Sequence, residues 1–241
     1  MLIHGIWDRW EAWQPVIPEL STRYHLVIPE LRGHGRSDKP AGGYELTDYA
    51  GDIRNLIERL ELPQPFICGH SLGALVTMQL AADDRFGRIS AVILEDPPLR
   101  ITSDGAASFN ILLHVKHGSE EETYAAVSEI YAGRGETEWQ RITEWLRGTA
   151  DGPLEQIVAA GGRNTSFLPL IGEVQVPMLL LQADPAFGGA MSDEDAESAR
   201  QLKADTAFQR FDATGHGIHQ QRPADFCRAV FTFLEELHQN G

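Results

Sequence analysis

The sequence predicts an α/β fold in which a mostly parallel sheet carries helices on both faces. Short apolar runs alternate with segments of helical periodicity, which is typical of parallel strands joined by crossover helices. The strand-like runs stop over residues 99–169 and then resume. With 241 residues, of which 42% are hydrophobic, the chain suits one large domain with an insertion. We therefore expect a core formed by residues 1–98 and 170–241, and a helical lid formed by residues 99–169.

In the first part of the core, strands are predicted where apolar runs are short, and helices where apolar side chains recur every three or four positions. Residues 46–60 show the helical pattern, with Ile53, Leu56 and Ile57 on one face. Pro15 is expected to break a helix over residues 10–20. The expected elements are strand 1–4, helix 10–20, strand 25–30, helix 46–60, strand 66–68, helix 74–82 and strand 89–95.

The second part of the chain continues with the insertion and then returns to alternation. Ser192 is a good N-cap for an acidic first helical turn, and Pro223 suits the first turn of the last helix. Three short helices are expected in the lid, over residues 125–131, 139–146 and 154–160. The core is then expected to resume with strand 178–183, helix 193–202, strand 206–211 and helix 223–237.

The pentapeptide Gly69-His70-Ser71-Leu72-Gly73 follows a predicted strand and precedes a predicted helix. A G-x-S-x-G sequence in this setting is typical of a nucleophile elbow, a strained turn that exposes the serine hydroxyl. The two glycines remove Cβ atoms that would clash in such a turn. The helix N-terminus beneath Ser71 favours developing negative charge. Ser71 is therefore the predicted nucleophile.

A serine nucleophile needs a base to accept its proton, and a histidine is the usual choice. His216 lies in Thr214-Gly215-His216-Gly217, directly after the last predicted strand. This position is at the carboxyl edge of the sheet, where the elbow also lies. His219 competes for the role but lacks flanking glycines. We favour His216.

These segments, together with Leu2-Ile3-His4-Gly5, residues 32–37 and residues 95–98, resemble the α/β-hydrolase superfamily, and in particular its small, lid-bearing esterase and lipase-like branch. The resemblance implies an oxyanion hole formed by the backbone N–H groups of Ile6 and Leu72. Such donors stabilise a tetrahedral intermediate by about 3 kcal/mol each. His4 and His34 are expected to organise the surrounding loops.

The acid that orients the histidine has three candidates. The resemblance places it either after strand 178–183, where Asp184 stands one residue too early, or at the end of strand 89–95, where Glu95 has the matching position. Glu95 and Asp184 are nearly even, with Glu95 slightly preferred. Asp96 ranks third, because Asp-Pro is an ordinary turn at a strand end.

The start of the chain departs from the family pattern. Members normally open with a β-hairpin before the strand that ends in His-Gly, whereas this sequence begins inside that strand. The N-terminal hairpin is thus expected to be missing, which would leave strand 25–30 at the sheet edge with Leu26, Val27 and Ile28 available for pairing. We expect either a longer natural protein or a homodimer that buries this edge.

Composition narrows the range of partners. Thirty-five acidic against 20 basic residues give a net charge of −15, which argues against nucleic acids and anionic membranes. We interpret the excess mainly as a solvated acidic surface. Only Cys68 and Cys227 are present, which favours buried thiols in a reducing compartment. Cytoplasmic localisation is expected, with no metal, because Cys/His zinc spacing is absent, and no cofactor, because a phosphate-binding glycine loop is absent.

A lid over the elbow would form a pocket from which water is excluded. The predicted apolar lining consists of Trp7, Phe109, Trp139, Trp145 and Phe187. The predicted function is hydrolysis of a small carboxylic ester through an acyl-enzyme. The alternatives are hydrolysis of a lactone, an amide or a C–C bond on the same scaffold, and a hydrolase-like ligand receptor with little turnover.

Overall fold

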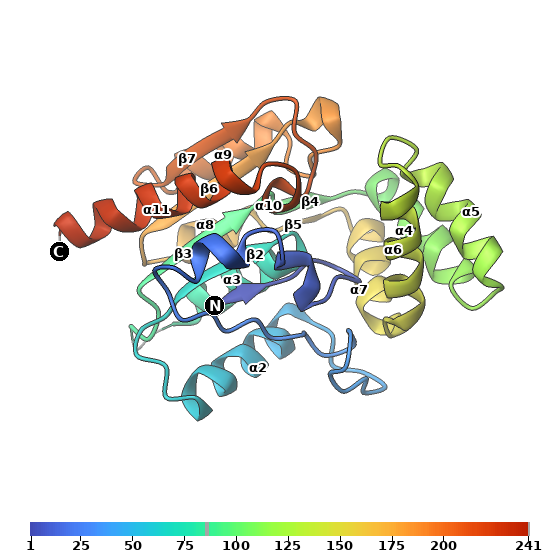
Figure 1. The fold of residues 1–241 in the computed structure, drawn as a ribbon, viewed down its shortest axis with the longest axis horizontal. Helices are drawn as coiled ribbons and strands as arrows, with labels where there is room; N and C mark the ends of the chain where they lie inside the picture. The colour runs from blue at the N-terminus through green and yellow to red at the C-terminus, as the bar shows by residue number, and fades with distance from the viewer. Residues whose placement is uncertain (85–86, 241) are drawn as a thin grey trace.

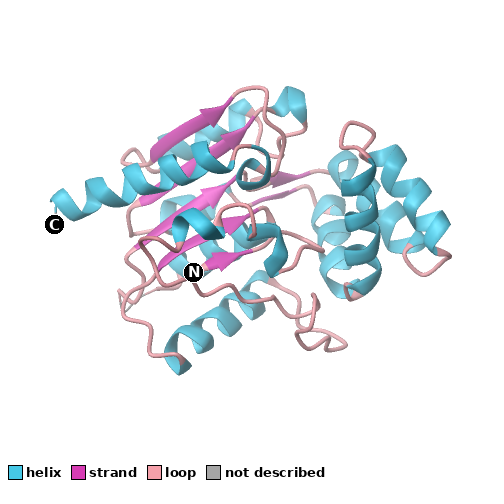
Figure 2. Ribbon diagram, viewed as in Figure 1, coloured by secondary structure: helices cyan, strands magenta, loops and turns pink. Residues whose placement is uncertain are grey.

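The computed structural model describes residues 1–84 and 87–240. Within these residues, five parallel strands form one sheet in the order β1-β2-β3-β6-β7, with helices on both faces (Figures 1 and 2). The strands are β1 (Leu2–Ile3), β2 (Phe66–His70), β3 (Ala91–Glu95), β6 (Met178–Ala183) and β7 (Ala207–Phe211). This architecture confirms the α/β prediction.

Alternating side chains of the central strands enter two separate hydrophobic cores. Ile67 and Val92 face the core that is covered by α2 and α3, whereas Cys68 and Ile93 face the core that is covered by α11. Burial on both faces explains why these strands are nearly continuous apolar runs. The helices that cover the first face are α2 (Leu46–Arg59), α3 (Leu72–Ala82), α8 (Leu168–Glu173) and α9 (Asp193–Leu202); η1 (Trp10–Trp13), α1 (Ile17–Leu20) and α11 (Pro223–Asn240) cover the second.

The inserted segment forms four helices to one side of the sheet (Figure 1). They are α4 (Ser103–Val115), α5 (Glu120–Ile130), α6 (Glu136–Gly148) and α7 (Asp151–Gly162). The two ends of the insertion are paired by β4 (Arg100–Ile101) and β5 (Thr165–Ser166), which are antiparallel. Two short elements complete the fold near the carboxyl edge of the sheet, η2 (Pro185–Phe187) and α10 (Ile218–Gln221).

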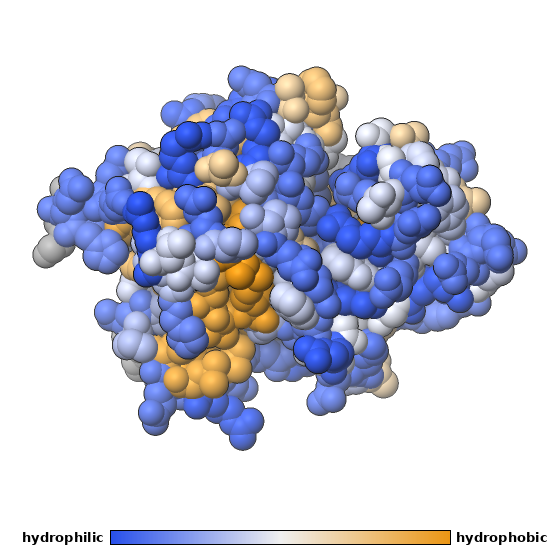
Figure 3. All heavy atoms as spheres, in the orientation of Figure 1, coloured by the Kyte–Doolittle hydropathy of each residue, from blue (hydrophilic) through white to orange (hydrophobic). Residues whose placement is uncertain are grey.

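The strand predicted over residues 25–30 is not formed, so this prediction is wrong. Leu2 N–H donates to the Val27 carbonyl (2.9 Å), but β1 has only two residues and pairs with β2, so it offers too little edge for a ladder. Apolar side chains gather beside the N-terminus (Figure 3), where Leu26, Val27 and Phe66 are among the residues lining a hollow of about 360 Å³. Burial of residues 25–30 in a homodimer stays a prediction.

Candidate active site

Ser71 stands between β2 and α3 in a conformation that L-residues rarely adopt, with φ 54° and ψ −117°. Holding a non-glycine residue there costs about 1–3 kcal/mol and needs support from the surrounding structure. The support comes from close packing. A Cβ on Gly69 would lie 2.2 Å from the Gly73 carbonyl oxygen, and a Cβ on Gly73 would lie 2.2 Å from the Ile3 carbonyl oxygen. Both glycines are therefore required where β2, α3 and β1 meet.

Ser71 and His216 line the same pocket, which has a volume of about 310 Å³. Its floor is the carboxyl edge of the sheet, and its roof comes from the inserted helices, including Phe109 of α4, Arg141 of α6 and Ile157 of α7. The insertion therefore covers the serine, as a lid would. The elbow and the C-terminal histidine, which are far apart in the sequence, meet at one site.

Asp96 is the carboxylate that contacts His216. His216 Nδ1 lies 2.7 Å from Asp96 Oδ2, and Asp96 is fully buried. Backbone N–H groups of Ala183, Ala190 and Met191 donate to the same carboxylate at 2.7–3.3 Å. These donors fix the carboxylate, which in turn fixes the imidazole. With Nδ1 engaged, Nε2 is the nitrogen left to exchange a proton in the pocket.

Glu95, which we predicted as the acid, does not contact His216 and faces His219 instead. Its carboxylate lies 2.8 Å from His219 Nδ1 and accepts from the His219 backbone N–H at 2.9 Å. Successive strand residues point to opposite faces, so the side chains of Glu95 and the following Asp96 diverge at the strand end. Burial alone would raise the pKa of Glu95, but the charges of His219 and His70 outweigh burial and hold this pKa below its usual value.

His219, the competing histidine, belongs to this buried pair. It is fully buried and stacks on Trp13 with ring centroids 4.1 Å apart. Asp184, the other predicted acid, also lies off the site. It accepts from the backbone N–H groups of Ala186 and Ala213 and pairs with Arg210 at 3.2 Å, so it organises the turn after β6. The position of Asp184, one residue too early for the family's acid, agrees with this placement outside the site.

The electrostatic surroundings favour a neutral His216. Burial, and then the charge of His70, lower the pKa of His216, and they outweigh the contribution of Asp96. His70, the residue before the nucleophile, donates through Nε2 to the His216 carbonyl oxygen (3.1 Å), and its Nδ1 lies 3.7 Å from Asp8 Oδ2. Burial alone would lower the pKa of His70, but the charges of Glu95 and Asp8 raise it. A neutral imidazole is the form that can act as a base.

The predicted oxyanion donors are positioned at the pocket. Ile6 and Leu72 both line it, and Leu72 is the first residue of α3, where backbone N–H groups have no partner within the helix. His4 and His34 organise the adjoining loops. Leu31 N–H donates to His4 Nε2 (3.0 Å), and His34 Nδ1 lies 2.9 Å from the Arg32 carbonyl oxygen. Burial lowers the pKa of His34 to about 3, so this ring is neutral.

Of the five predicted lining residues, Trp7 and Phe109 line the pocket, with ring centroids 5.4 Å apart. The other three were wrong. Trp139 turns its Nε1–H to the Tyr131 carbonyl (2.7 Å). Trp145 is buried beneath the guanidinium groups of Arg9 and Arg141. Phe187 is 60% exposed, because the short turn after β6 directs it to solvent.

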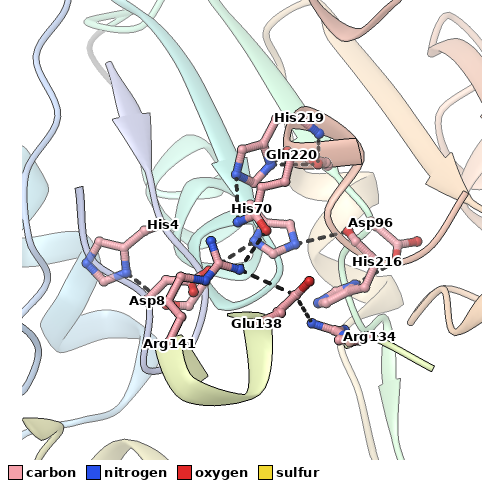
Figure 4. A network of polar contacts seen from close by, with 12 residues as sticks. His4, Asp8, His70, Asp96, Arg134, Glu138, Arg141, His216, His219 and Gln220 are labelled. Carbon is pink, nitrogen blue, oxygen red and sulfur yellow. Dashed lines mark hydrogen bonds and ion pairs between the residues drawn. The ribbon is translucent and has the colours of Figure 1, made fainter. Parts of the chain in front are cut away.

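Sequence reasoning missed the polar part of the pocket wall. Asp8, His70 and Gln220 line it on the core side, and three arginines line it on the side of the insertion: Arg100, Arg134 and Arg141. Figure 4 shows most of these groups as one polar network around His216. Arg134 lies in the turn before α6 and Arg141 lies within α6, so no helical period in the sequence links the two.

A family model described as "Alpha/beta hydrolase family" matches residues 1–229. The chain belongs to this family. It is a hydrolase by family membership. Ser71, Asp96 and His216 occur in the chain order in which this fold carries its nucleophile, acid and histidine.

Relatives within the family differ in the reactions that their names state. In an alignment of 248 positions, the chain is 27% identical to 2-(acetamidomethylene)succinate hydrolase of Mesorhizobium japonicum. The alignment covers 98% of this chain and 87% of that protein. A stretch of 81 residues is 43% identical to an uncharacterized Mycobacterium tuberculosis protein, and this match covers 34% of the chain but only 24% of that protein's length. The fold is similar to that of an enol-lactonase from Burkholderia xenovorans (TM-score 0.80, 21% identity, 97% of this chain and 90% of the other).

Two further observations concern metals and membranes. Among residues 1–84 and 87–240, no group of three or more His, Cys, Asp or Glu side chains is placed to hold a metal ion. No helix in the described part of the chain has the length and apolarity needed to cross a membrane. Cys68 and Cys227 are both free and buried.

Proposed function

We propose that this protein is a serine hydrolase that cleaves a small carboxylic ester through an acyl-enzyme, with Ser71, His216 and Asp96 as its triad. One observation carries the proposal: His216 Nδ1 lies 2.7 Å from the buried Asp96 carboxylate, while His216 and Ser71 line one pocket. A ligand receptor would need neither this fixed imidazole nor a strained serine.

The reaction consists of two half-reactions, acylation of Ser71 and hydrolysis of the acyl-enzyme. In the first, Ser71 Oγ attacks the ester carbonyl carbon, and His216 Nε2 accepts the hydroxyl proton. The C–O bond to the alcohol then breaks, and the imidazolium returns its proton to the leaving alkoxide. In the second, water attacks the acyl carbon and His216 accepts its proton; the bond between the acyl carbon and Ser71 Oγ then breaks, the imidazolium returns the proton to Ser71 Oγ, and the carboxylic acid leaves. Asp96 stays ionised and stabilises the imidazolium in both halves.

The intermediate of each half-reaction carries negative charge on the former carbonyl oxygen. The N–H groups of Ile6 and Leu72 are proposed to bind this oxygen. Donors fixed by the fold stabilise such charge without reorganisation, at about 3 kcal/mol each. The insertion above the pocket strengthens these interactions by excluding water.

The proposal is tested with excess 4-nitrophenyl butyrate under pre-steady-state and steady-state conditions. We expect a burst of nitrophenol equal to the enzyme concentration and steady turnover for the parent protein. Ser71→Ala should lower turnover by at least about 10³-fold. Ser128→Ala is the matched control, because Ser128 is a half-buried residue of α5 that does not line the pocket and whose hydroxyl donates to the Ala125 carbonyl of the same helix. A parent protein that binds the ester without turnover would favour the receptor alternative instead.

A second candidate function is hydrolysis of an acyl–nitrogen bond by the same residues. It is favoured by the relative that matches 98% of this chain, whose name states an acetamido-bearing succinate as its substrate. The chemistry differs only in the leaving group, because His216 would protonate a nitrogen instead of an oxygen. Comparison of 4-nitrophenyl acetate with 4-nitroacetanilide separates the two candidates. Faster cleavage of the anilide would replace the ester proposal.

A further inference from the structure

The pocket wall has a charge balance opposite to that of the chain. The whole sequence holds 35 acidic and 20 basic residues, yet the charged side chains among the described residues lining the pocket are three arginines, Arg100, Arg134 and Arg141, and one carboxylate, Asp8. The side chains of Arg134 and Arg141 are 30% and 31% exposed, and partial burial of a guanidinium group beside an apolar pocket is costly unless a partner compensates its charge. The three arginines differ in whether a carboxylate of the protein fully compensates them.

Arg100 is compensated within the protein, because its Nε lies 2.5 Å from Asp195 Oδ1. Arg134 and Arg141 are different, since both approach one oxygen of a single carboxylate. Arg134 Nη1 lies 3.0 Å and Arg141 Nη2 lies 3.3 Å from Glu138 Oε1. Figure 4 shows Glu138 between the two guanidinium groups. Two positive charges thus share one negative charge at the roof of the pocket.

Aromatic rings hold both guanidinium groups in place. The Arg134 carbon Cζ lies 4.9 Å from the Tyr131 ring centroid, and the Arg141 carbon Cζ lies 4.9 Å from the Trp145 ring centroid. Arg141 also donates to Gln220 Oε1 at 2.9 Å, which ties the insertion to α10, directly after the loop that carries His216. Groups that are already fixed lose little entropy when they bind a ligand.

The two charges act on the reaction centre from the insertion side. Arg134 contributes to the lowered pKa of His216, although burial and His70 contribute more. Arg141 contributes to the lowered pKa of Asp8, where the nearby His70 is the larger favourable cause and burial opposes the shift. Both guanidinium groups therefore lie within electrostatic reach of the residues around Ser71.

We propose that Arg134 and Arg141 bind a carboxylate of the substrate, so that the protein acts on acyl compounds that carry a second, ionised acid group. Planar guanidinium groups bind carboxylates through paired, charge-assisted hydrogen bonds, and a half-compensated arginine pair beside an apolar pocket supplies them. The proposal rests on the proposed function, since it names the substrate class for that site. It also assigns Arg134 and Arg141 as the residues that set specificity.

The test compares two esters that differ only in charge. Mono(4-nitrophenyl) adipate carries a free carboxylate, and methyl 4-nitrophenyl adipate does not, while the leaving group is the same. We expect the parent protein to prefer the anionic ester by at least about tenfold in kcat/KM. The ratio should fall to about one in the double variant Arg134→Gln with Arg141→Gln, and it should decrease with salt. Use of a ratio cancels any effect common to both esters.

Two controls make the comparison specific. Arg59→Gln removes the same charge from the exposed last turn of α2, outside the pocket, and should keep the ratio of the parent. Arg134→Lys with Arg141→Lys keeps the charge but removes the planar guanidinium groups with their paired donors. It should give a ratio between those of the parent and the double glutamine variant. If the double glutamine variant fails to fold, the two single variants replace it, and each should lower the ratio.

A binding measurement separates this proposal from the proposed function. Calorimetry of Ser71→Ala with monomethyl adipate and with dimethyl adipate needs no turnover. Tighter binding of the monoester by at least about tenfold supports the arginine site. This holds even if neither nitrophenyl ester is cleaved, because absence of cleavage would count only against the proposed ester hydrolysis. Equal binding of the two esters, or a preference that survives in the double glutamine variant, would overturn the arginine site.

Discussion

Replacement of each neighbouring acid at the end of β3 should give opposite results. Asp96→Asn removes the charge beside His216, whereas Glu95→Gln removes the charge beside His219. Asp96 Oδ2 faces Ala190 N–H and His216 Nδ1, and Oδ1 faces two further N–H groups. In either orientation, the NH₂ group introduced by Asp96→Asn would therefore face an N–H donor from which the Asp96 carboxylate now accepts. Loss of the imidazolium partner should lower kcat by about 10³–10⁴-fold, or about 4–5.5 kcal/mol.

Glu95→Gln should instead affect stability. The pair with His219 is fully buried, and removal of one buried charge from such a pair costs about 3–5 kcal/mol. Gln keeps one acceptor, and Glu95 Oε1 accepts from both His219 nitrogen donors, so we expect the lower end of that range. For a chain of this size, about 3 kcal/mol corresponds to a fall in Tm of about 6–12 °C. The ester should still be cleaved within about tenfold of the parent rate below the new Tm.

The assay pairs kcat/KM at 20 °C with thermal unfolding followed by circular dichroism. Glu95→Asp and Asp96→Glu serve as charge-preserving controls, and each should retain more of the property that its amide variant loses. Loss of turnover in Glu95→Gln at an unchanged Tm, with Asp96→Asn still active, would contradict these roles of the two acids. Glu95 would then be the orienting acid after all.

The remaining predictions concern the base, the elbow and the pocket. In the pH profile of kcat/KM, the acid limb should have its midpoint below the usual histidine pKa of 6.5, because burial first and then His70 lower the pKa of His216. A midpoint above 6.5 would contradict this prediction. Ser71→Gly should be about 1 kcal/mol more stable than Ser71→Ala in urea titration, because glycine relieves the strain at φ 54°, and equal stabilities would argue against strain. Phe109→Ala should raise KM, whereas Trp139→Ala should lower Tm without that effect; the reverse pattern would place Trp139 in the pocket.

The sheet and the two chemical motifs could be predicted because they depend on local pattern. The predicted boundaries of strand 178–183 and helix 193–202 match β6 and α9. Residues 25–30 have the same apolar character as the other strands, but a strand exists only where a partner forms a ladder with it. That condition concerns distant residues and is invisible in a single segment.

The site was predicted only as far as its motifs extend. Ser71 and His216 have flanking glycines that reveal a turn, whereas Glu95 and Asp96 are adjacent carboxylates in one local pattern. The orientation of each is set by the strand end and by donors from residues 183–191, which lie far away in the chain. The aromatic residues of the insertion were assigned by type alone, and the structure shows that helix packing decides which of them face the pocket.

The most direct test of the central claim is the intact mass of the protein after treatment with a fluorophosphonate. The reagent reacts with a serine that an adjacent base activates. We expect one adduct on the parent protein, none on Ser71→Ala, and a labelling rate in Asp96→Asn that is lower by at least about 10²-fold. No adduct on a folded parent protein, or an adduct that persists in Ser71→Ala, would contradict the claim that Ser71 is the activated nucleophile.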